Sequence, residues 1–303
     1  MPAPVILFTY NRPEHTARAL KSLAAADMAK TTELFIFCDG AKETPGDAER
    51  TAQVRQLCHD EAKGFASTNV IERDRNMGLA ANIIDGVGMV IKNCGRAIVL
   101  EDDLTVSPFF LRYMNAALDY YEGRGVFSVS GYSPDIDIPK DYSASTYMMH
   151  RNCSWGWATW RSQWEKVDWE VPSFDTFIRD SRRRSAFNEC GNDLSPMLLR
   201  WKIGEINSWS IRFCYAAFLR GEPTVYPRKS LVRNGGADGS GTNMRLSHRY
   251  DAPLAANVGL QNFATGVAPD HRIVTQFRRF YDTSAIRRVI NALKRWRYVT
   301  LGR

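Results

Sequence analysis

The stretch AIVLEDDLTVSPFF, residues 97–110, decides how the rest of the chain is interpreted. Four residues that suit a buried β-strand, Ala97 to Leu100, run directly into three carboxylates, Glu101, Asp102 and Asp103. Charge is costly to bury, so three acids at the exit of a core strand indicate either a solvated turn that caps the next helix or a site for a hard cation. A divalent ion accounts for the concentrated charge better than a turn does.

The chain before this stretch alternates between two kinds of apolar pattern. Apolar runs predict strands over residues 5–9, 33–38 and 97–100, the stretch STNVIERD predicts another over 67–74, and helical spacing predicts helices over 14–26, 48–62 and 77–93. This alternation predicts a parallel sheet with right-handed crossovers. Ligands of such sheets collect at the carboxyl ends of the strands, so one edge is expected to carry Asn11, Arg12, Asp39, Arg75 and the triplet Glu101 to Asp103.

Composition limits the class of protein. The 303 residues are 44% hydrophobic and 24% charged, an ordinary globular mixture, and the net charge of +7 favours anionic partners. Basic residues are spread along the chain without a helix-turn-helix, RNA-recognition or zinc-finger pattern, so nucleic acid is not expected as a partner. Six cysteines without a CxxC pair, and no signal peptide before Val5, predict reduced thiols in a cytoplasmic protein. No apolar run approaches the roughly 20 residues of a membrane span.

The second half is richer in aromatic residues. Residues 182–221 have a mostly helical pattern, and residues 221–243 predict a strand that passes into a glycine-rich loop. Trp160 and Trp164, spaced by four, predict a buried helical stripe. Near the C-terminus an apolar series at helical spacing is surrounded by cations, a pattern shared by a helix docked on the body and by a helix lying on anionic lipid. The apolar members are Ile286, Val289, Ile290, Leu293 and Trp296, and the cations are Arg287, Arg288, Lys294, Arg295 and Arg297.

Four segments carry a family resemblance: ILFTYNRP (6–13), FCDG (37–40), RDRNMGLAANI (73–83) and VLEDDLTVSPFFLRY (99–113). In this order they resemble the nucleotide-sugar domain of GT-A-fold glycosyltransferases, in particular the inverting N-acetylglucosaminyltransferase I type and related bacterial family 2-like sugar transferases. The resemblance covers about residues 4–243. It implies one continuous α/β domain, a Rossmann-like mixed and mostly parallel sheet flanked by helices. Residues 1–128 would bind the nucleotide-sugar, 129–270 would form a looser acceptor-binding half, and 271–303 a basic amphipathic helix.

The resemblance also implies roles for individual residues. Asp103 would hold Mn²⁺ or Mg²⁺ at the nucleotide diphosphate, Asp39 would contact uracil, and Glu101 and Asp102 would contact ribose and donor sugar, with Asp102 also near the reacting centre. Asp39 is equally suited to a strand-end turn. Thr9, Asn11, Arg12 and Arg75 would complete the donor site, although either arginine could pair with neighbouring acids instead. VSGYSPD (129–135) and NCSWGWATW (152–160) would line a sugar or acceptor pocket with Tyr132, Trp155 and Trp157.

The catalytic base is where the chain departs from the family. The family places an aspartate just before a tryptophan in the stretch that matches GEINSWSIRF (204–213), but this chain has Asn207 and Ser208 there. The alternatives are Glu205 in a shifted register, Asp135 or Asp238 as a substitute, or impaired transfer.

The function implied is metal-dependent transfer of a hexosyl or N-acetylhexosaminyl group from a nucleotide-sugar, expected to be UDP-linked, with inversion. The acceptor would be a glycan or lipid-linked oligosaccharide of bacterial cell-surface polysaccharide synthesis, reached from the cytoplasmic face of the membrane, with an anionic membrane surface as a further partner. A catalytically impaired nucleotide-sugar-binding relative is the alternative. A sugar nucleotidyltransferase would open with a glycine-rich phosphate loop, which FTYNRPEHT (8–16) does not contain.

Overall fold

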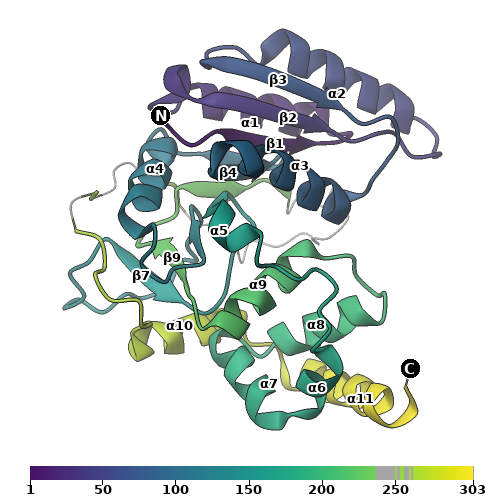
Figure 1. Ribbon diagram of the computed structural model, residues 1–303, viewed down its shortest axis with the longest axis vertical. Helices are drawn as coiled ribbons and strands as arrows, with labels where there is room; N and C mark the ends of the chain where they lie inside the picture. The colour runs from purple at the N-terminus through teal and green to yellow at the C-terminus, as the bar shows by residue number, and fades with distance from the viewer. Residues whose placement is uncertain (237–249, 251–252, 256–258, 261, 303) are drawn as a thin grey trace.

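The computed structural model describes residues 1–236, 250, 253–255, 259–260 and 262–302 (Figure 1). Its first half alternates strands and helices as the apolar patterns predict. The elements are β1 (Val5–Thr9), α1 (Pro13–Ala24), the 3-10 helix η1 (Ala29–Thr31), β2 (Glu33–Cys38), α2 (Asp47–Glu61), β3 (Ser67–Glu72), α3 (Leu79–Cys94), β4 (Arg96–Glu101) and β5 (Leu104–Val106).

The second half has shorter strands and more helix. Its first elements are α4 (Phe110–Tyr121), β6 (Ser128–Ser130), β7 (Thr146–Met149), β8 (Trp157–Trp160) and α5 (Arg161–Trp164). A helical region follows, made of α6 (Phe174–Arg179), α7 (Ser181–Phe187), the 3-10 helix η2 (Asn188–Cys190), α8 (Leu194–Lys202) and α9 (Trp209–Arg220). The last elements are β9 (Thr224–Pro227), β10 (Val232–Asn234), α10 (His271–Tyr281) and α11 (Ala285–Leu301).

The described residues form an eight-stranded sheet in the order β3-β2-β1-β4-β8-β6-β9-β7. The first four strands are parallel, as predicted, but β8 pairs with β4 in the antiparallel sense and β7 is antiparallel to β9. The sheet is therefore mixed, and it changes from parallel to antiparallel beside β4. Because β8, β6, β9 and β7 extend the sheet of the first half, one sheet runs through both predicted halves.

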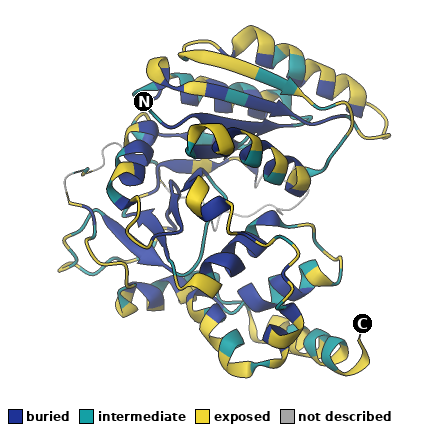
Figure 2. Cartoon of the chain, in the orientation of Figure 1, coloured by how far each residue is buried: buried dark blue, intermediate teal, exposed yellow. Residues whose placement is uncertain are grey.

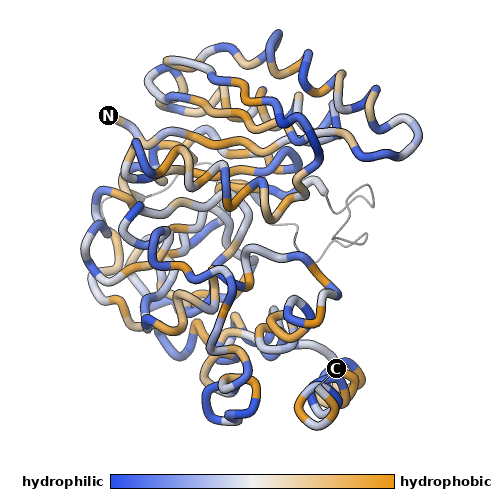
Figure 3. Tube along the Cα trace, turned by 45° about the vertical axis from the view of Figure 1, so that its right-hand side comes forward, coloured by the Kyte–Doolittle hydropathy of each residue, from blue (hydrophilic) through white to orange (hydrophobic). Residues whose placement is uncertain are grey.

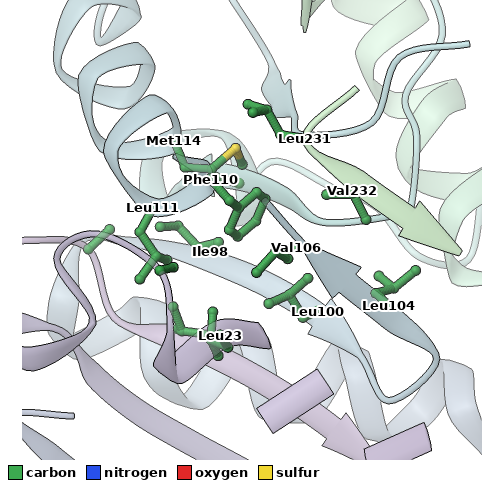
Figure 4. Close-up of a cluster of buried hydrophobic side chains, with 14 of the residues drawn as sticks. Leu23, Ile98, Leu100, Leu104, Val106, Phe110, Leu111, Met114, Leu231 and Val232 are labelled. Carbon is green, nitrogen blue, oxygen red and sulfur yellow. The ribbon is translucent and has the colours of Figure 1, made fainter. Parts of the chain in front are cut away.

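The inner strands of this sheet are largely buried (Figure 2), and two clusters of apolar side chains cover its two faces. Alternate residues of β1 point to opposite faces, so that Val5 and Leu7 pack in the layer with α1, α2 and α4, whereas Ile6 and Phe8 pack with α3, α5 and α9. Residues of β4 divide in the same way, and Ile98 and Leu100 pack with Leu23, Phe110 and Leu111 (Figure 4). The parallel pairing of β4 with β1 sets its direction, and with it the edge at which its carboxylates emerge.

Two sequence predictions are wrong in detail. Trp160 and Trp164 are both buried, but they are not a helical stripe: Trp160 ends strand β8 and Trp164 lies in α5, in the layer on the other face of the sheet. Residues 271–303 were predicted to form one helix, whereas α10 ends at Tyr281 and α11 begins after Ser284, whose hydroxyl accepts from the amide of Arg287 and caps the second helix. The described residues contain no helix long and apolar enough to cross a bilayer. All six cysteines are free thiols.

Candidate active site

The candidate site lies at the carboxyl ends of β1, β2 and β4. Phe8 of β1 is in register with Glu101 of β4, so the residues after each strand emerge side by side. Arg12 Nη2 donates to Asp102 Oδ1 and, at 3.1 Å, to Asp103 Oδ2. The side chains of both aspartates are largely buried. The structure therefore brings the acidic triplet and Arg12 together, and it uses Arg12 as an ion-pair partner of two acids.

The triplet is an unfavourable place for negative charge. Burial raises the pKa of Asp102 to about 6, although the neighbouring Arg12 guanidinium opposes this shift. Burial, together with the charges of Asp103 and Asp102, raises the pKa of Glu101 well above its ordinary value. Carboxylates crowded in a poorly solvated setting gain from any added cation, so the electrostatics favour binding of positive charge.

A glycine-containing segment meets the triplet from the second half. Strand β10 pairs with β5, and the amide of Gly235 donates to the backbone carbonyl of Asp103 at 2.7 Å. A Cβ on Gly236 would lie 2.3 Å from Asp103 Oδ2, so only glycine leaves room for the carboxylate at this position. Residues 237–249, including Asp238, lie outside the described residues.

Whether the triplet suits a metal ion depends on how many ligands the ion needs. The described residues contain no group of three or more histidine, cysteine, aspartate or glutamate side chains placed to hold a metal. Mg²⁺ is usually bound through one or two carboxylates together with substrate phosphates and water, and carboxylate oxygen is the hard donor it prefers. Asp103 supplies carboxylate oxygen of this kind, with Arg12 Nη2 3.1 Å from its Oδ2 and a residue without a side chain, Gly236, next to it.

Asp39 holds a turn together. Its Oδ1 accepts from the amides of Gly40 at 2.9 Å and Met77 at 2.8 Å, and its Oδ2 accepts from the amide of Gly78 at 3.1 Å. The residue is buried at the end of β2. A Cβ on Gly40 would lie 2.2 Å from the carbonyl carbon of Arg75, so the two loops are in direct contact. These contacts are those of a residue that stabilises a strand-end turn, which the sequence allowed for Asp39 as an alternative to a contact with the base.

Two other predicted donor residues are also engaged with protein groups. Thr9 is buried, and its hydroxyl lies 3.2 Å from the sulfur of Cys38. Asn11 Nδ2 donates to Asp47 Oδ1, while the hydroxyl of Tyr10 donates to Asp47 Oδ2. Arg75, in contrast, is exposed, and no ion pair joins it to any part of the chain that the structure describes. Of the predicted phosphate contacts, Arg75 is the one left available to an anion.

Asp47 is a residue that sequence reasoning missed. It is buried at the first position of α2, where its Oδ2 also accepts from the amide of Lys42 at 2.7 Å. Although burial alone would raise its pKa, the hydrogen bonds from Tyr10, Lys42 and Asn11 lower the pKa of Asp47 overall. Gly46-Asp47 before a helical pattern was the available signal. Asp47 fixes the loop after β1 against the loop after β2.

The three predicted aromatic residues separate into two environments. Tyr132 is buried with its ring centroid 4.7 Å from that of Trp155, and among the described residues its hydroxyl has no hydrogen-bond partner. Trp155 is half-buried, and its ring also packs edge-to-face with that of Tyr250 at 5.2 Å between centroids. Trp157 is 2% exposed, with ring centroids of Trp164 and Trp209 at 5.8 and 4.8 Å. Since a sugar needs an open ring face, the structure places Trp157 in the core and not in a pocket.

Glu205 lies in the connection between α8 and α9. Its Oε2 accepts from Lys294 Nζ at 2.6 Å and from Arg200 Nε at 3.3 Å. The hydrogen bond with Lys294 lowers the pKa of Glu205, which weakens it as a proton acceptor. Ser208 stands just before Trp209, where the resembling enzymes are expected to have their aspartate. Its hydroxyl caps α9 by accepting from the amide of Ile211. Asp135 is exposed and lies near enough to Tyr132 to influence the pKa of that phenol, which burial raises first.

No protein-family model and no curated protein matches this chain. Two solved structures are similar to it. TarS from S. aureus has a TM-score of 0.43 and 12% identity, over 77% of this chain and 36% of TarS, so the chain spans about a third of that protein. The mannosyltransferase PcManGT from Pyrobaculum calidifontis, solved in complex with GDP-Man and Mn²⁺, has a TM-score of 0.39 and 12% identity over 72% of both chains. Neither similarity identifies a donor, an acceptor or a metal for this chain.

Proposed function

We propose that this protein is a glycosyltransferase that binds a nucleotide-sugar, UDP-linked, with the help of Mn²⁺ or Mg²⁺. The observation that carries the proposal is the acidic triplet at the exit of β4, with Asp102 buried and its neighbours half-buried, beside Arg12 and at the edge where the parallel strands end. The resemblance of four segments around this edge to GT-A-fold glycosyltransferases also supports a nucleotide-sugar site here. A nucleotide diphosphate is the ligand class that combines an anion with a bridging cation.

Each side chain then has a defined task. Asp103 would hold the ion, whose chemistry is to offset charge on the departing nucleotide. Glu101 and Asp102 would accept from hydroxyls of ribose and donor sugar, and Arg75 would contact phosphate. Asp39 would act mainly through the loop it organises, by holding the Arg75 segment in place, and a direct contact with uracil would use its remaining lone pairs.

The acceptor site is assigned to the aromatic residues of the second half. Trp155, with Tyr132 behind it, would form a platform for a glycan or lipid-linked oligosaccharide in bacterial cell-surface polysaccharide synthesis. Transfer with inversion needs a carboxylate that removes the proton of the attacking hydroxyl. The ion pairs of Glu205 count against it, so we favour Asp135 within the described residues. A lipid-linked acceptor would bring the enzyme to the cytoplasmic face of the membrane.

Calorimetry tests the donor site. UDP should bind in the presence of Mn²⁺ and lose about tenfold or more in affinity when the metal is chelated or in Asp103→Ala, since Asp103 would hold an ion that offsets the charge of the diphosphate. Glu165→Ala, a change of an exposed carboxylate on α5's C-terminal side, is the matched control and should bind as the wild type does. UDP affinity that is independent of metal in all three proteins would remove the metal from the proposal.

A second candidate function is donor binding without efficient transfer. Asn207 and Ser208 favour it, because neither is a base at neutral pH and Ser208 is occupied as a helix cap. The two functions are separated by UDP release from a panel of UDP-sugars with acceptors. A wild type that binds UDP but releases none, together with an Asn207→Asp variant that gains release, would identify the impaired relative.

A further inference from the structure

One side of the C-terminal helix α11 packs on the body, through polar groups and through Tyr298 and Val299, which lie against the apolar cluster of α6 to α9. Lys294 Nζ donates to Glu205 at 2.6 Å, and the hydroxyl of Tyr298 donates to Asp175 Oδ1 at 2.8 Å. Arg179 donates to the backbone carbonyl of Val299. Figure 1 shows α11 at the edge of the molecule, beside α6 and α8. The side of α11 that faces the body is therefore the one that carries Lys294, Tyr298 and Val299.

The apolar side of α11 is turned to solvent. Ile286, Val289, Leu293 and Trp296 recur at spacings of three and four, and they are 76, 60, 57 and 59% exposed. None of the residues of α11 is buried. A helix docked on a globular body ordinarily buries its apolar stripe and exposes its charges. In α11 this arrangement is reversed, and the hydropathy along the chain is shown in Figure 3.

The charge on α11 has one sign. The helix contains five cations, Arg287, Arg288, Lys294, Arg295 and Arg297, and no carboxylate. Another cation, Arg184 of α7, lies close enough to Arg295 to be affected by it: burial first, and then Arg295, lowers the pKa of the Arg184 guanidinium. Arg295 is half-buried on the side of α11 toward α7, and Lys294 is paired with Glu205, whereas Arg287 and Arg297 are exposed beside the apolar stripe. Exposed cations beside an outward apolar stripe are the pattern of a helix that lies at the surface of anionic lipid.

We propose that the outward stripe of α11, from Ile286 to Trp296, inserts into the surface of an anionic bilayer while the opposite side of the helix stays bound to α6, α8 and Glu205. A second copy of the chain is a poorer occupant, because stripe-to-stripe contact would bring the exposed Arg287 and Arg297 of one copy against those of the other. Glu205 is then a positioning residue that presents the helix. The inference goes beyond the proposed transfer reaction, because an inactive chain would bind lipid equally well.

Co-sedimentation with vesicles tests this proposal on the full chain. The wild type should bind vesicles that contain phosphatidylglycerol at least about tenfold more strongly than vesicles of phosphatidylcholine, and added salt should remove this preference. The double variant Leu293→Ser/Trp296→Ser should lose most of the binding, while Arg287→Gln/Arg297→Gln should lose the preference for anionic lipid. Leu219→Ser on α9 is the matched control, because Leu219 is 48% exposed and lies outside α11.

The outcomes separate folding, dimerisation and lipid binding. Melting temperature and UDP affinity should be unchanged in the stripe variants. If the double variant unfolds, vesicle binding is measured instead with the single variant Leu293→Ser. Tryptophan fluorescence is then also compared between the wild type and Trp296→Phe when vesicles are added. Equal vesicle binding by Leu293→Ser and Leu219→Ser, or a wild type that ignores vesicles and dimerises through the stripe in ultracentrifugation, overturns the proposal. Vesicle binding by a chain that does not bind UDP would retain it and remove the proposed function.

Discussion

Replacing Asp39 with Ala should destabilise the protein more than it weakens any single ligand contact. The substitution removes the acceptor of the Met77 and Gly78 amides, which connect β2 to a loop 38 and 39 residues further along the chain. Hydrogen bonds to a charged group contribute about 1.5 to 3 kcal/mol each, so losing two gives about 3 to 6 kcal/mol. The expected fall in melting temperature is about 6 °C or more for a chain of this size.

The variant Asp39→Asn should lose less stability than Asp39→Ala. Its single carbonyl oxygen can still accept from Gly40 and Met77, the two amides now bound to Oδ1, but its NH₂ group would face the amide of Gly78. We therefore expect about half the destabilisation of the Ala variant. Scanning calorimetry at neutral pH measures both, with Asp137→Ala, an exposed aspartate, as the control.

The result that refutes this reasoning is a melting temperature unchanged in Asp39→Ala. If UDP affinity fell at the same time, Asp39 would be a base contact and the loop would be held by other groups. A large loss of stability with UDP affinity unchanged would assign Asp39 to the turn alone. Loss of both is expected if the loop also positions Arg75.

Two further predictions concern carboxylates with protein partners. Glu205→Gln should reduce UDP release by less than tenfold, compared with about 10² to 10⁴-fold for a lost general base, and Asp135→Asn should show the larger loss in the same assay. Asp47, whose folded-state pKa is lowered, stabilises the fold above its unfolded pKa, and this contribution is lost as pH falls through the folded value. Acid titration of unfolding should therefore show a smaller loss for Asp47→Asn than for the wild type, and parallel curves would contradict the role of Asp47.

The first half of the fold could be predicted because its signals are local. Three of the first four strands, β1, β2 and β4, contain an apolar run, and the observed β1 coincides with the predicted residues 5–9. The strands β5 to β10 have three or four residues, too few to show a period, and their pairing depends on distant partners such as Val129 and Val225. The sheet's change of direction beside β4 was for this reason not visible in the sequence.

The site was predictable in position but not in its pairings. Strand ends meet at one edge, so the proximity of Arg12 to the acidic triplet follows from topology, whereas its bond to Asp102 joins residues 90 positions apart. The same holds for Glu205 and Lys294, 89 residues apart. Helical spacing identified the stripe of α11, but spacing alone does not say which side of a helix meets the body.

The strand order has a consequence for synthesis on the ribosome. Strand β4 cannot pair with its antiparallel neighbour β8 until residues 157–160 have emerged from the ribosome, and β6 cannot pair with β9 until residues 224–227 have emerged. During these intervals the nascent chain carries an open sheet edge, first apolar β4 and then β6, of the kind that pairs with other chains. Stalled or truncated products that end before β9 would therefore carry such an open edge and be prone to aggregate, those that end before β8 through the longer and more apolar edge of β4.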